Sequence, residues 1–305
     1  MAVIANGLSM MDFFDRTYAP LRLGAGAKST RNKFRQSIAL LESILGRTAY
    51  LADLTDELVA AACNAKIQRG RSPATANGIR GKINALWTLA AKRRVIDTYP
   101  TMPRLREYVR VPTAWSREQL QRLWAACREE PGEVCGIPAG VWWLNLHGVL
   151  WDTGARIGVI VAILKGKGRI TGLEWVQIDL HERTVLLVAE HQKQKADQRF
   201  PLHADTATAL LLHQRPRHDR WVFPWPWCEG TLYNRYKHIL RRADLPAGRR
   251  DKFHKMRRSV ASWYEAAGGN ATDLLGHSSR KVTRAYLDPL IVGPKQPADV
   301  LFRIG

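Results

Sequence analysis

Apolar residues recur every three or four positions through the first hundred residues, which is the spacing of amphipathic helices. Side chains that commonly cap helix starts precede these stripes at Ser9, Ser29, Thr55 and Ser72, and Asp12 completes a capping-box start at the first of them. We therefore predict a bundle of four helices. Its buried faces would carry Phe13, Phe14, Tyr18, Phe34, Ile38, Leu41, Leu45, Leu58, Val59, Ala62, Ile79, Ile83, Leu86 and Ala90.

The helical period stops near Tyr99. Between Tyr99 and Pro112 prolines and arginines alternate (YPTMPRLREYVRVP), which is typical of an extended segment. We predict a helical domain over residues 1–103, a linker over 104–114 and a second domain over 115–305. Two domains also suit a chain of 305 residues, which is long for one core.

The second domain mixes two periods. Ser116 and Gln119 form a capping box for a helix that ends near Arg128, and a strongly apolar helix follows over about 141–150. The predicted fold class is an N-terminal all-α bundle followed by a mixed α+β, mostly helical domain with a small antiparallel sheet. The strand residues would be Val176, Ile178, Val185, Leu187 and Phe200, and the later helices would span 204–213, 231–243 and 253–267.

The charge of the chain points to a polyanionic partner. Forty-seven Lys and Arg residues against 27 Asp and Glu leave a net charge of +20. DNA is the commonest partner of so basic a surface, although a ribosomal or a membrane-surface protein could be equally basic. Basic side chains on the second and fourth helices predict a surface that faces DNA phosphates, against the alternative of a solvated face. They are Arg31, Lys33, Arg35, Arg80 and Lys82.

The cysteines and the N-terminal residues indicate the compartment. Cys63, Cys127, Cys135 and Cys228 show no C-x-x-C spacing, which argues against both a zinc site and a disulfide framework. The start, MAVIANGLSMMDFF, lacks the pattern of a signal peptide, and no apolar run is long enough to span a bilayer. We expect a cytoplasmic, nucleoid-associated protein with no membrane partner.

Three segments of the second domain carry residues suited to phosphate chemistry. The first is TGAR, residues 153–156, which follows the apolar helix. The second contains His254-x-x-Arg257, and the third contains Leu-Gly-His277 with Tyr286 nine positions further on. In this order and at this spacing the motifs resemble those of the tyrosine recombinases, or phage integrases, and the resemblance covers most of the chain.

The resemblance implies an activity and its partners. Residues 1–103 resemble the family's core-binding domain, and 115–305 its catalytic domain. The implied activity is site-specific recombination, which cleaves and rejoins DNA strands through a 3′-phosphotyrosine intermediate with no metal or nucleotide cofactor. The implied partners are double-stranded DNA with a specific recombination site and further copies of the chain, as a homotetramer on two DNA sites. The implied catalytic residues are Arg156, Lys193, His254, Arg257, His277 and Tyr286.

This chemistry is consistent with the residues themselves. Two guanidiniums, Arg156 and Arg257, can bind the non-bridging oxygens of a phosphodiester and stay charged at any working pH. A histidine can take the proton of Tyr286, whose phenol is otherwise a poor nucleophile. The resemblance assigns Lys193 to protonate the leaving 5′-oxygen, because it stands eight residues before Pro201 in a predicted hairpin. Lys195 ranks second for that role.

The sequence departs from the family near Arg156. In the family a tryptophan follows the corresponding arginine after about nine residues, whereas Trp175 stands 19 positions after Arg156. We interpret 159–168 as an insertion whose apolar run (VIVAIL) is buried by lengthening the preceding helix. The alternative is that it pulls the Arg156 guanidinium off the phosphate. Arg169 is a rival for the arginine role, and deleting 159–168 is expected to leave a folded protein that cleaves faster.

Other interpretations of the motif residues remain open. Arg156 could serve only as a partner for a helix C-terminus, His254 as a buried structural histidine and Tyr286 as a core aromatic. For the whole chain, the rival functions are a type IB topoisomerase and a DNA-binding relative that has lost catalysis. Synapsis of two sites would exclude the first, and covalent trapping on a nicked duplex would exclude the second.

Overall fold

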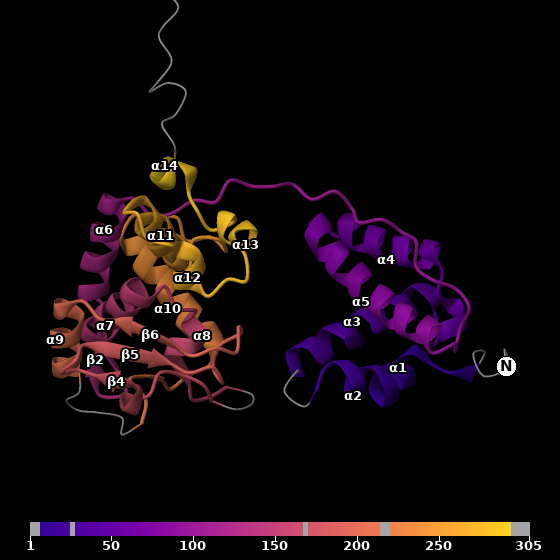
Figure 1. The fold of residues 1–305 in the computed structure, drawn as a ribbon, viewed down its shortest axis with the longest axis horizontal. Helices are drawn as coiled ribbons and strands as arrows, with labels where there is room; N and C mark the ends of the chain where they lie inside the picture. The colour runs from indigo at the N-terminus through magenta and orange to yellow at the C-terminus, as the bar shows by residue number, and fades with distance from the viewer. Residues whose placement is uncertain (1–6, 25–27, 167–169, 214–219, 294–305) are drawn as a thin grey trace, which may run out of the picture. The chain divides into compact units, whose positions relative to one another are not determined.

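The computed structural model divides into two compact units, Met1–Arg110 and Val111–Gly305, which are described separately (Figure 1). The division falls inside the segment predicted as a linker, which contains no helix or strand. The fold class predicted from the sequence is confirmed, with a helical first unit and a second unit of helices and small sheets. The structure describes residues 7–24, 28–166, 170–213 and 220–293.

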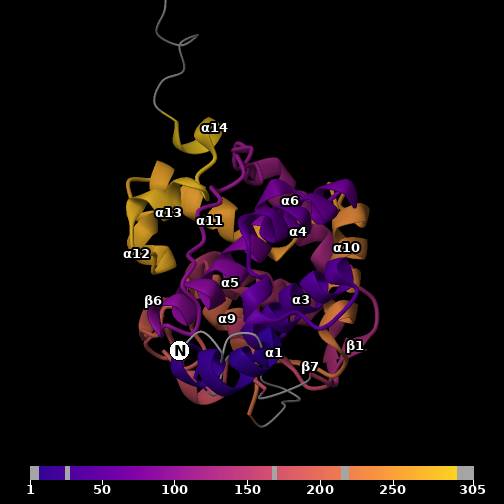
Figure 2. The ribbon, with the colours of Figure 1, turned by 90° about the vertical axis from the view of Figure 1, so that its right-hand side faces the viewer.

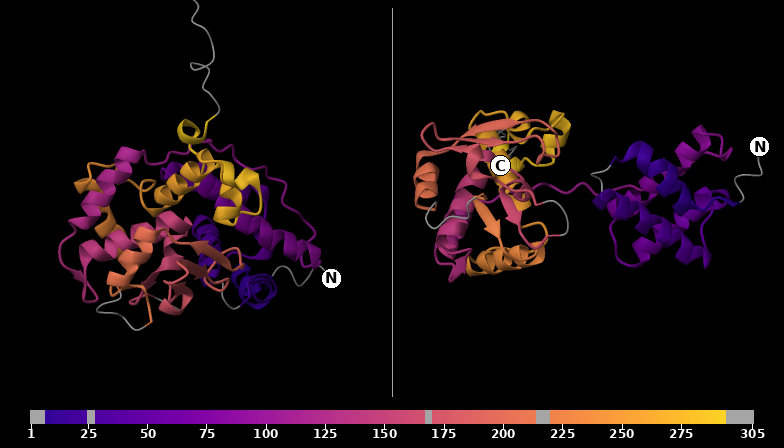
Figure 3. Two further views of the ribbon diagram at one scale, coloured as in Figure 1. Left: turned by 60° about the vertical axis from the view of Figure 1, so that its left-hand side comes forward. Right: turned by 90° about the horizontal axis from the view of Figure 1, so that it is seen from below.

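The first unit is a helical bundle, drawn in indigo and purple in Figure 3. At three of the four predicted helix starts the side chain caps the helix: Ser9, Thr55 and Ser72 accept hydrogen bonds from backbone N–H groups at 3.0, 3.2 and 3.4 Å. The fourth, Ser29, is not a cap, because it already lies inside helix α3. The predicted stripes form the core, in which Ile38, Leu41, Val59 and Ile83 are fully buried. The elements are α1 Met10–Phe13, η2 Phe14–Tyr18, α2 Ala19–Arg22, α3 Lys28–Leu45, η3 Leu51–Asp53, α4 Asp56–Gln68 and α5 Pro73–Lys92.

The second unit surrounds one apolar helix. Helix α7, Ala139–Thr153, is the central helix: Trp142, Trp143, Leu146 and Val149 are each inaccessible to solvent, and every other residue of the helix is at least partly buried. The other helices are α6 Arg117–Arg128, α8 Ile157–Ile160, α9 Ala204–His213, α10 Glu229–Arg242, α11 Phe253–Ala266, α12 Ala271–Leu275, α13 Arg280–Arg284 and α14 Pro289–Val292. The last four lie together at one end of the unit, as Figures 1 and 2 show.

The predicted antiparallel sheet is present. Strands β4 Ile178–Asp179, β5 Thr184–Leu187 and β6 Gln198–Pro201 pair in that order, with Val185 opposite both Ile178 and Phe200. The placement of Val176 in a strand is wrong, because it lies in the 3-10 helix η4 Trp175–Gln177 and is 87% exposed. A further hairpin of β1 Glu133–Val134 and β2 Ile137–Pro138 precedes α7.

The apolar run after Arg156 is buried, but the prediction that it lengthens the helix is wrong. Helix α7 stops at Thr153, and α8 contains only four residues before the chain becomes strand β3, Val161–Ile163. Strand β3 pairs in parallel with β7, Phe223–Trp225. The segment is therefore part of the core rather than an addition to it. Its end at Gly168 and the rival Arg169 lie outside the described residues.

Candidate active site

Arg156 is placed by the end of helix α7. Gly154 closes the helix with a left-handed φ of 59°, and a side chain at this position would come within 3.3 Å of both Leu275 and Val260. Arg156 is the third residue after α7, in extended backbone at the start of α8, so it does not end the helix as expected. Its Nη1 donates a hydrogen bond to Oε1 of Gln194 at 3.1 Å.

Arg257 lies on α11 and is 4% exposed. Its Nη2 donates to the carbonyl of Leu275 at 2.8 Å, and its Nη1 donates to the carbonyl of Gly154. The side chain thus joins the end of α7 to the end of α12. Its Nε has no hydrogen-bond partner among the described residues. A guanidinium carries five N–H donors, so Arg257 keeps donors free for a phosphate after these two contacts.

His277 precedes helix α13 and Tyr286 follows it, and the two side chains lie close together. His277 Nδ1 and Thr283 Oγ1 are 3.1 Å apart, and the Tyr286 N–H donates to the Thr283 carbonyl at 2.8 Å. The His277 and Tyr286 rings lie 4.8 Å apart between centroids. Cζ of Arg257 lies 5.9 Å from the Tyr286 ring centroid. The structure therefore brings Arg257, His277 and Tyr286 into one cluster.

Burial and the two guanidiniums together set the protonation of both histidines. Burial, followed by the charges of Arg257 and Arg156, lowers the pKa of His277 to about 4. His254 keeps an exposed face on α11, but crowding of its other side by protein atoms lowers its pKa, as do Arg257, Arg258 and Arg156. Both imidazoles are therefore neutral at pH 7, so either can accept a proton. Burial and the charge of Arg156 also lower the pKa of Arg257.

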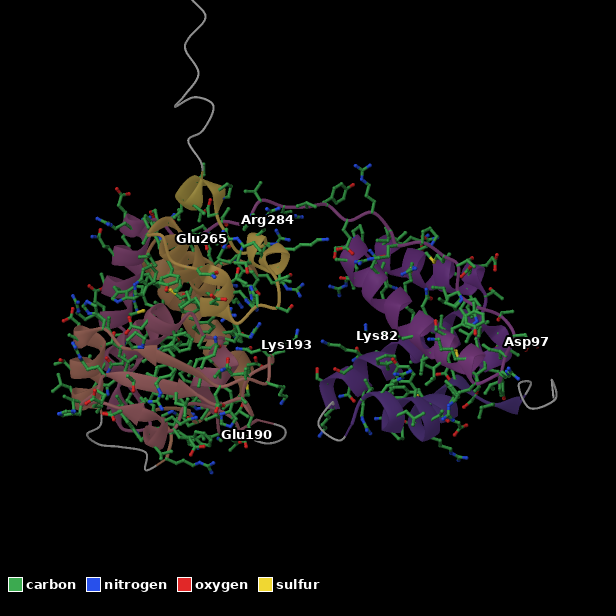
Figure 4. The ribbon with its side chains drawn as sticks, viewed as in Figure 1. Lys82, Asp97, Glu190, Lys193, Glu265 and Arg284 are labelled. Atoms are coloured by element: carbon green, nitrogen blue, oxygen red, sulfur yellow. The ribbon has the colours of Figure 1, made fainter. Side chains whose placement is uncertain are left out.

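Among the described residues, no contact joins Lys193 to this cluster. It is exposed on the loop that joins β5 to β6 (Figure 4). Lys195, the second candidate, is also exposed and has a φ of 57°. Gln194, which stands between these two lysines, is the residue of this loop that contacts Arg156. Its Oε1 accepts from Arg156, and its Nε2 donates to Gln198 Oε1 at 2.7 Å.

The comparisons with known proteins agree with this geometry. Residues 115–290 match the model of the phage integrase family. The chain belongs to the phage integrase family of site-specific tyrosine recombinases. A comparison with curated proteins found no match.

Two solved integrases share the fold. A lambda integrase dimer bound to a COC′ core site superposes with a TM-score of 0.67 at 20% identity, over 92% of this chain and 96% of that one. The Tn1549 transposon integrase in complex with transposon right end DNA superposes with a TM-score of 0.72 at 13% identity, over 92% of this chain and 95% of that one. At these identities the likeness concerns the architecture of the chain, and the roles of its residues are argued from the site.

The basic residues predicted to face DNA have different surroundings in the first unit. Arg31 donates to the carbonyl of Gly24 at 2.8 Å, and Arg35 pairs with Asp15 at 2.8 Å. Arg80 donates through Nε to the carbonyl of Met102 at 2.8 Å. Burial and the nearby positive charge of Lys33 lower the pKa of Lys82, which Figure 4 labels on the first unit. These two lysines thus place two positive charges near each other in the first unit.

The sequence motifs did not reveal two residues that support the site. Thr283 is fully buried and holds both the His277 ring and the Tyr286 backbone. Its position three residues before Tyr286, on a short helix, was the available signal. Gln194 lies in a polar run in which nothing distinguishes it from Gln192 or Gln198.

The described residues hold neither a metal-binding group nor a membrane-spanning helix. No three His, Cys, Asp or Glu side chains in this part of the chain gather into a possible metal-binding group. Among the same residues, no helix is both long and apolar enough to cross a membrane.

Proposed function

We propose that Tyr286 is the nucleophile with which this recombinase cleaves DNA, and that Arg156, Arg257, His254 and His277 form the phosphate site around it. The observation that carries this proposal is the cluster of Arg257, His277 and Tyr286, assembled from α11, the end of α12 and the end of α13. Most of these contacts join segments that are separate in the sequence. One reaction uses every member of the cluster.

The reaction is a displacement at phosphorus. The Tyr286 hydroxyl oxygen attacks, a P–O bond to tyrosine forms, and the bond to the 5′-oxygen breaks. A neutral histidine can accept the phenol proton, and the low pKa of His277 keeps that imidazole unprotonated at pH 7. The departing 5′-oxygen takes up a proton, for which we propose Lys193. Attack of a 5′-hydroxyl from another strand reverses these steps and releases Tyr286.

The guanidiniums stabilise the charge that builds on the non-bridging oxygens. Arg257 is rigid, because two backbone carbonyls fix it. Arg156 is bound only by the Gln194 amide in the described structure, so a phosphate oxygen can replace that neutral acceptor with a charged one. Such preorganised donors are typically worth about 10²–10³ in rate each.

The partners follow from the same proposal. The lambda integrase forms a tetramer bound to a Holliday junction, and that structure superposes on 90% of this chain with a TM-score of 0.65 at 20% identity. We propose that this chain also binds double-stranded DNA carrying a specific site, that four copies assemble on two sites, and that it acts in the cytoplasm. Lys33 and Lys82 are the proposed phosphate contacts of the first unit, with Arg31, Arg35 and Arg80 beside them.

Nicked suicide duplexes tiled from the DNA that flanks the gene test the nucleophile. The parent protein should form a covalent adduct that survives denaturing electrophoresis, in EDTA as well as in buffer. Tyr286→Phe should form none while binding DNA with nearly unchanged affinity, because one oxygen performs the chemistry. Tyr264→Phe, at an exposed tyrosine on α11, is the matched control and should form adduct normally. Adduct formation by Tyr286→Phe would refute the assignment.

A further inference from the structure

Asp288 is a buried carboxylate two residues beyond the proposed nucleophile. It is 6% exposed, and each of its carboxylate oxygens accepts a hydrogen bond from a backbone N–H. Oδ1 accepts from Leu290 at 3.0 Å, which caps α14. Oδ2 accepts from Ala114 at 2.7 Å. Ala114 lies 174 positions earlier in the sequence, so this second bond has no part in capping the helix.

Ala114 is the last residue of the segment 104–114 that connects the two units. The residues that follow it are anchored on α11: the Trp115 N–H donates to Ser259 Oγ at 2.7 Å, and its carbonyl accepts from Trp263 Nε1 at 3.0 Å. Nζ of Lys255 lies 3.7 Å from the centroid of the Trp115 ring. The connecting segment therefore ends on one face of α11.

The nucleophile segment is bound to the same helix. Ser262 Oγ donates to the Tyr286 carbonyl at 3.3 Å and accepts from the Asp288 N–H at 2.9 Å. Residues 255, 259 and 262 are spaced by four and three positions and share one face of α11. His254 and Arg257 stand on an adjacent face. One helix thus carries His254 and Arg257 on one face and, on the adjacent face, the residues that bind the connecting segment and the backbone of the Tyr286 segment.

We propose that Asp288 is a positioning residue that ties the placement of Tyr286 to the end of the connecting segment. The inference rests on the proposed role of Tyr286 as nucleophile. The segment 104–114 is the covalent path between the units, so a movement of the first unit on DNA that stretches this segment pulls on Ala114. Asp288 passes that constraint to the backbone two residues from Tyr286. Binding by the first unit would then act on the rate of cleavage as well as on affinity.

Asp288→Asn tests this with little other change. Asparagine is a good N-cap, so it can keep the bond to Leu290, but it has only one acceptor oxygen and cannot also accept from Ala114. Loss of a hydrogen bond to a charged group changes the equilibrium constant that depends on it about ten- to a hundredfold. The rate of adduct formation at saturating suicide substrate should fall by that factor, while DNA affinity stays within about twofold.

A second measurement reports on the connecting segment itself. Trypsin should cut after Arg110 several times faster in Asp288→Asn than in the parent, because Ala114 is no longer bound. Asp244→Asn is the matched control: it removes the same charge from a carboxylate whose side chain is 96% exposed, and it should change neither readout. Rates are expressed per active molecule from the amplitude of the single-turnover reaction, so partial misfolding does not imitate the effect.

Either of two results overturns the proposal: a cleavage rate within twofold of the parent, or a loss of DNA affinity as large as the loss of rate. If Asp288→Asn does not fold, Asp288→Ser preserves a capping oxygen and is judged by the same two readouts. Tyr286→Phe separates the two proposals, because adduct formed by that variant refutes the nucleophile whatever Asp288 does.

Discussion

Two guanidiniums and partial burial act together on each histidine of the site. Burial is the largest cause of the low pKa of His277, and Arg257 and Arg156 add to it. A histidine with a pKa of about 4 instead of its ordinary 6.5 keeps its neutral form well below physiological pH. The DNA-free enzyme is therefore prepared to accept a proton before substrate arrives.

Histidine NMR titration of the DNA-free protein checks this. His277 should titrate near pH 4, and Arg156→Gln should raise its midpoint while leaving it below 6.5, because burial remains. Lys193→Gln should leave the midpoint unchanged, and His277→Gln assigns the resonance. A parent midpoint of 6.5 or more would mean that the guanidiniums do not lie close to His277.

Among single residues, those in the sequence motifs could be predicted, and those that hold the motif residues in place could not. Arg257, His277 and Tyr286 were identifiable because their types and spacing fit one reaction. Gln194 and Asp288 each contact a residue far away in the sequence, Arg156 at 38 positions and Ala114 at 174, and no local pattern encodes such contacts. Lys193 stays a prediction, because a lysine on an exposed loop has no contact that distinguishes its role.

Capping residues made the starts of four helices predictable, whereas strand β3 was missed. Ser9, Thr55, Ser72 and Ser116 mark helix starts within a residue, because each side chain satisfies a backbone N–H of the first turn. The run VIVAIL is apolar throughout and favours a buried helix and a buried strand equally. Its partner β7 lies about sixty residues later, and only pairing with β7 makes it a strand.

Gly172 gives a sharp test of the β3 packing. A Cβ at this position would lie 2.7 Å from the Ala162 Cβ and 2.8 Å from the Ala162 backbone nitrogen. Gly172→Ala should destabilise the second unit by about 1–3 kcal/mol, as overpacking does. Gly158→Ala, where the added carbon meets nothing within 4 Å, should be neutral or slightly stabilising. Urea denaturation compares the two, and equal midpoints would contradict the packing of β3.

The same packing reverses the expected effect of deleting 159–168. Val159, Ile160, Val161 and Ala162 are all buried, and the backbone of Leu173 bonds to Ile160 at 3.0 Å. Losing these contacts would leave β7 unpaired in the core. We therefore expect the deletion variant to unfold the second unit, seen as lost near-UV circular dichroism. A folded variant that cleaves faster would instead support the insertion hypothesis.

Helix α7 makes the second unit sensitive to acid. His147 is fully buried beside Tyr236, and burial lowers its pKa to about 4 from 6.5. Between these values the unfolded chain binds a proton that the folded chain does not, so stability falls as pH drops from 6.5 to 4, by up to about 3 kcal/mol. His147→Gln should flatten this dependence in urea denaturation. His181→Gln, at an exposed histidine, should not.

Across the whole molecule the charge of +20 has a measurable consequence for binding. A recombinase that contacts six to ten phosphates should lose about 10³–10⁵ in affinity between 50 and 200 mM salt, because each contact releases a condensed counterion. This term is independent of sequence, so it should appear on any duplex. A nearly flat salt response would mean that the positive surfaces are not directed at DNA.

Variants of Lys33 and Lys82 test whether the salt dependence of DNA affinity arises at the surface that these two lysines form. Burial and the neighbouring charge of Lys33 lower the pKa of Lys82, an unfavourable arrangement that a phosphate between the two ammonium groups would relieve. Lys33→Ala and Lys82→Ala should each reduce the slope of log affinity against log salt by about one. Lys82→Arg keeps the charge and should keep the slope. Arg80→Ala should also lower affinity, but with a lower melting temperature, because Met102 loses its donor. If both lysine variants keep the parent slope in fluorescence anisotropy at several salt concentrations, the DNA surface of the first unit lies elsewhere.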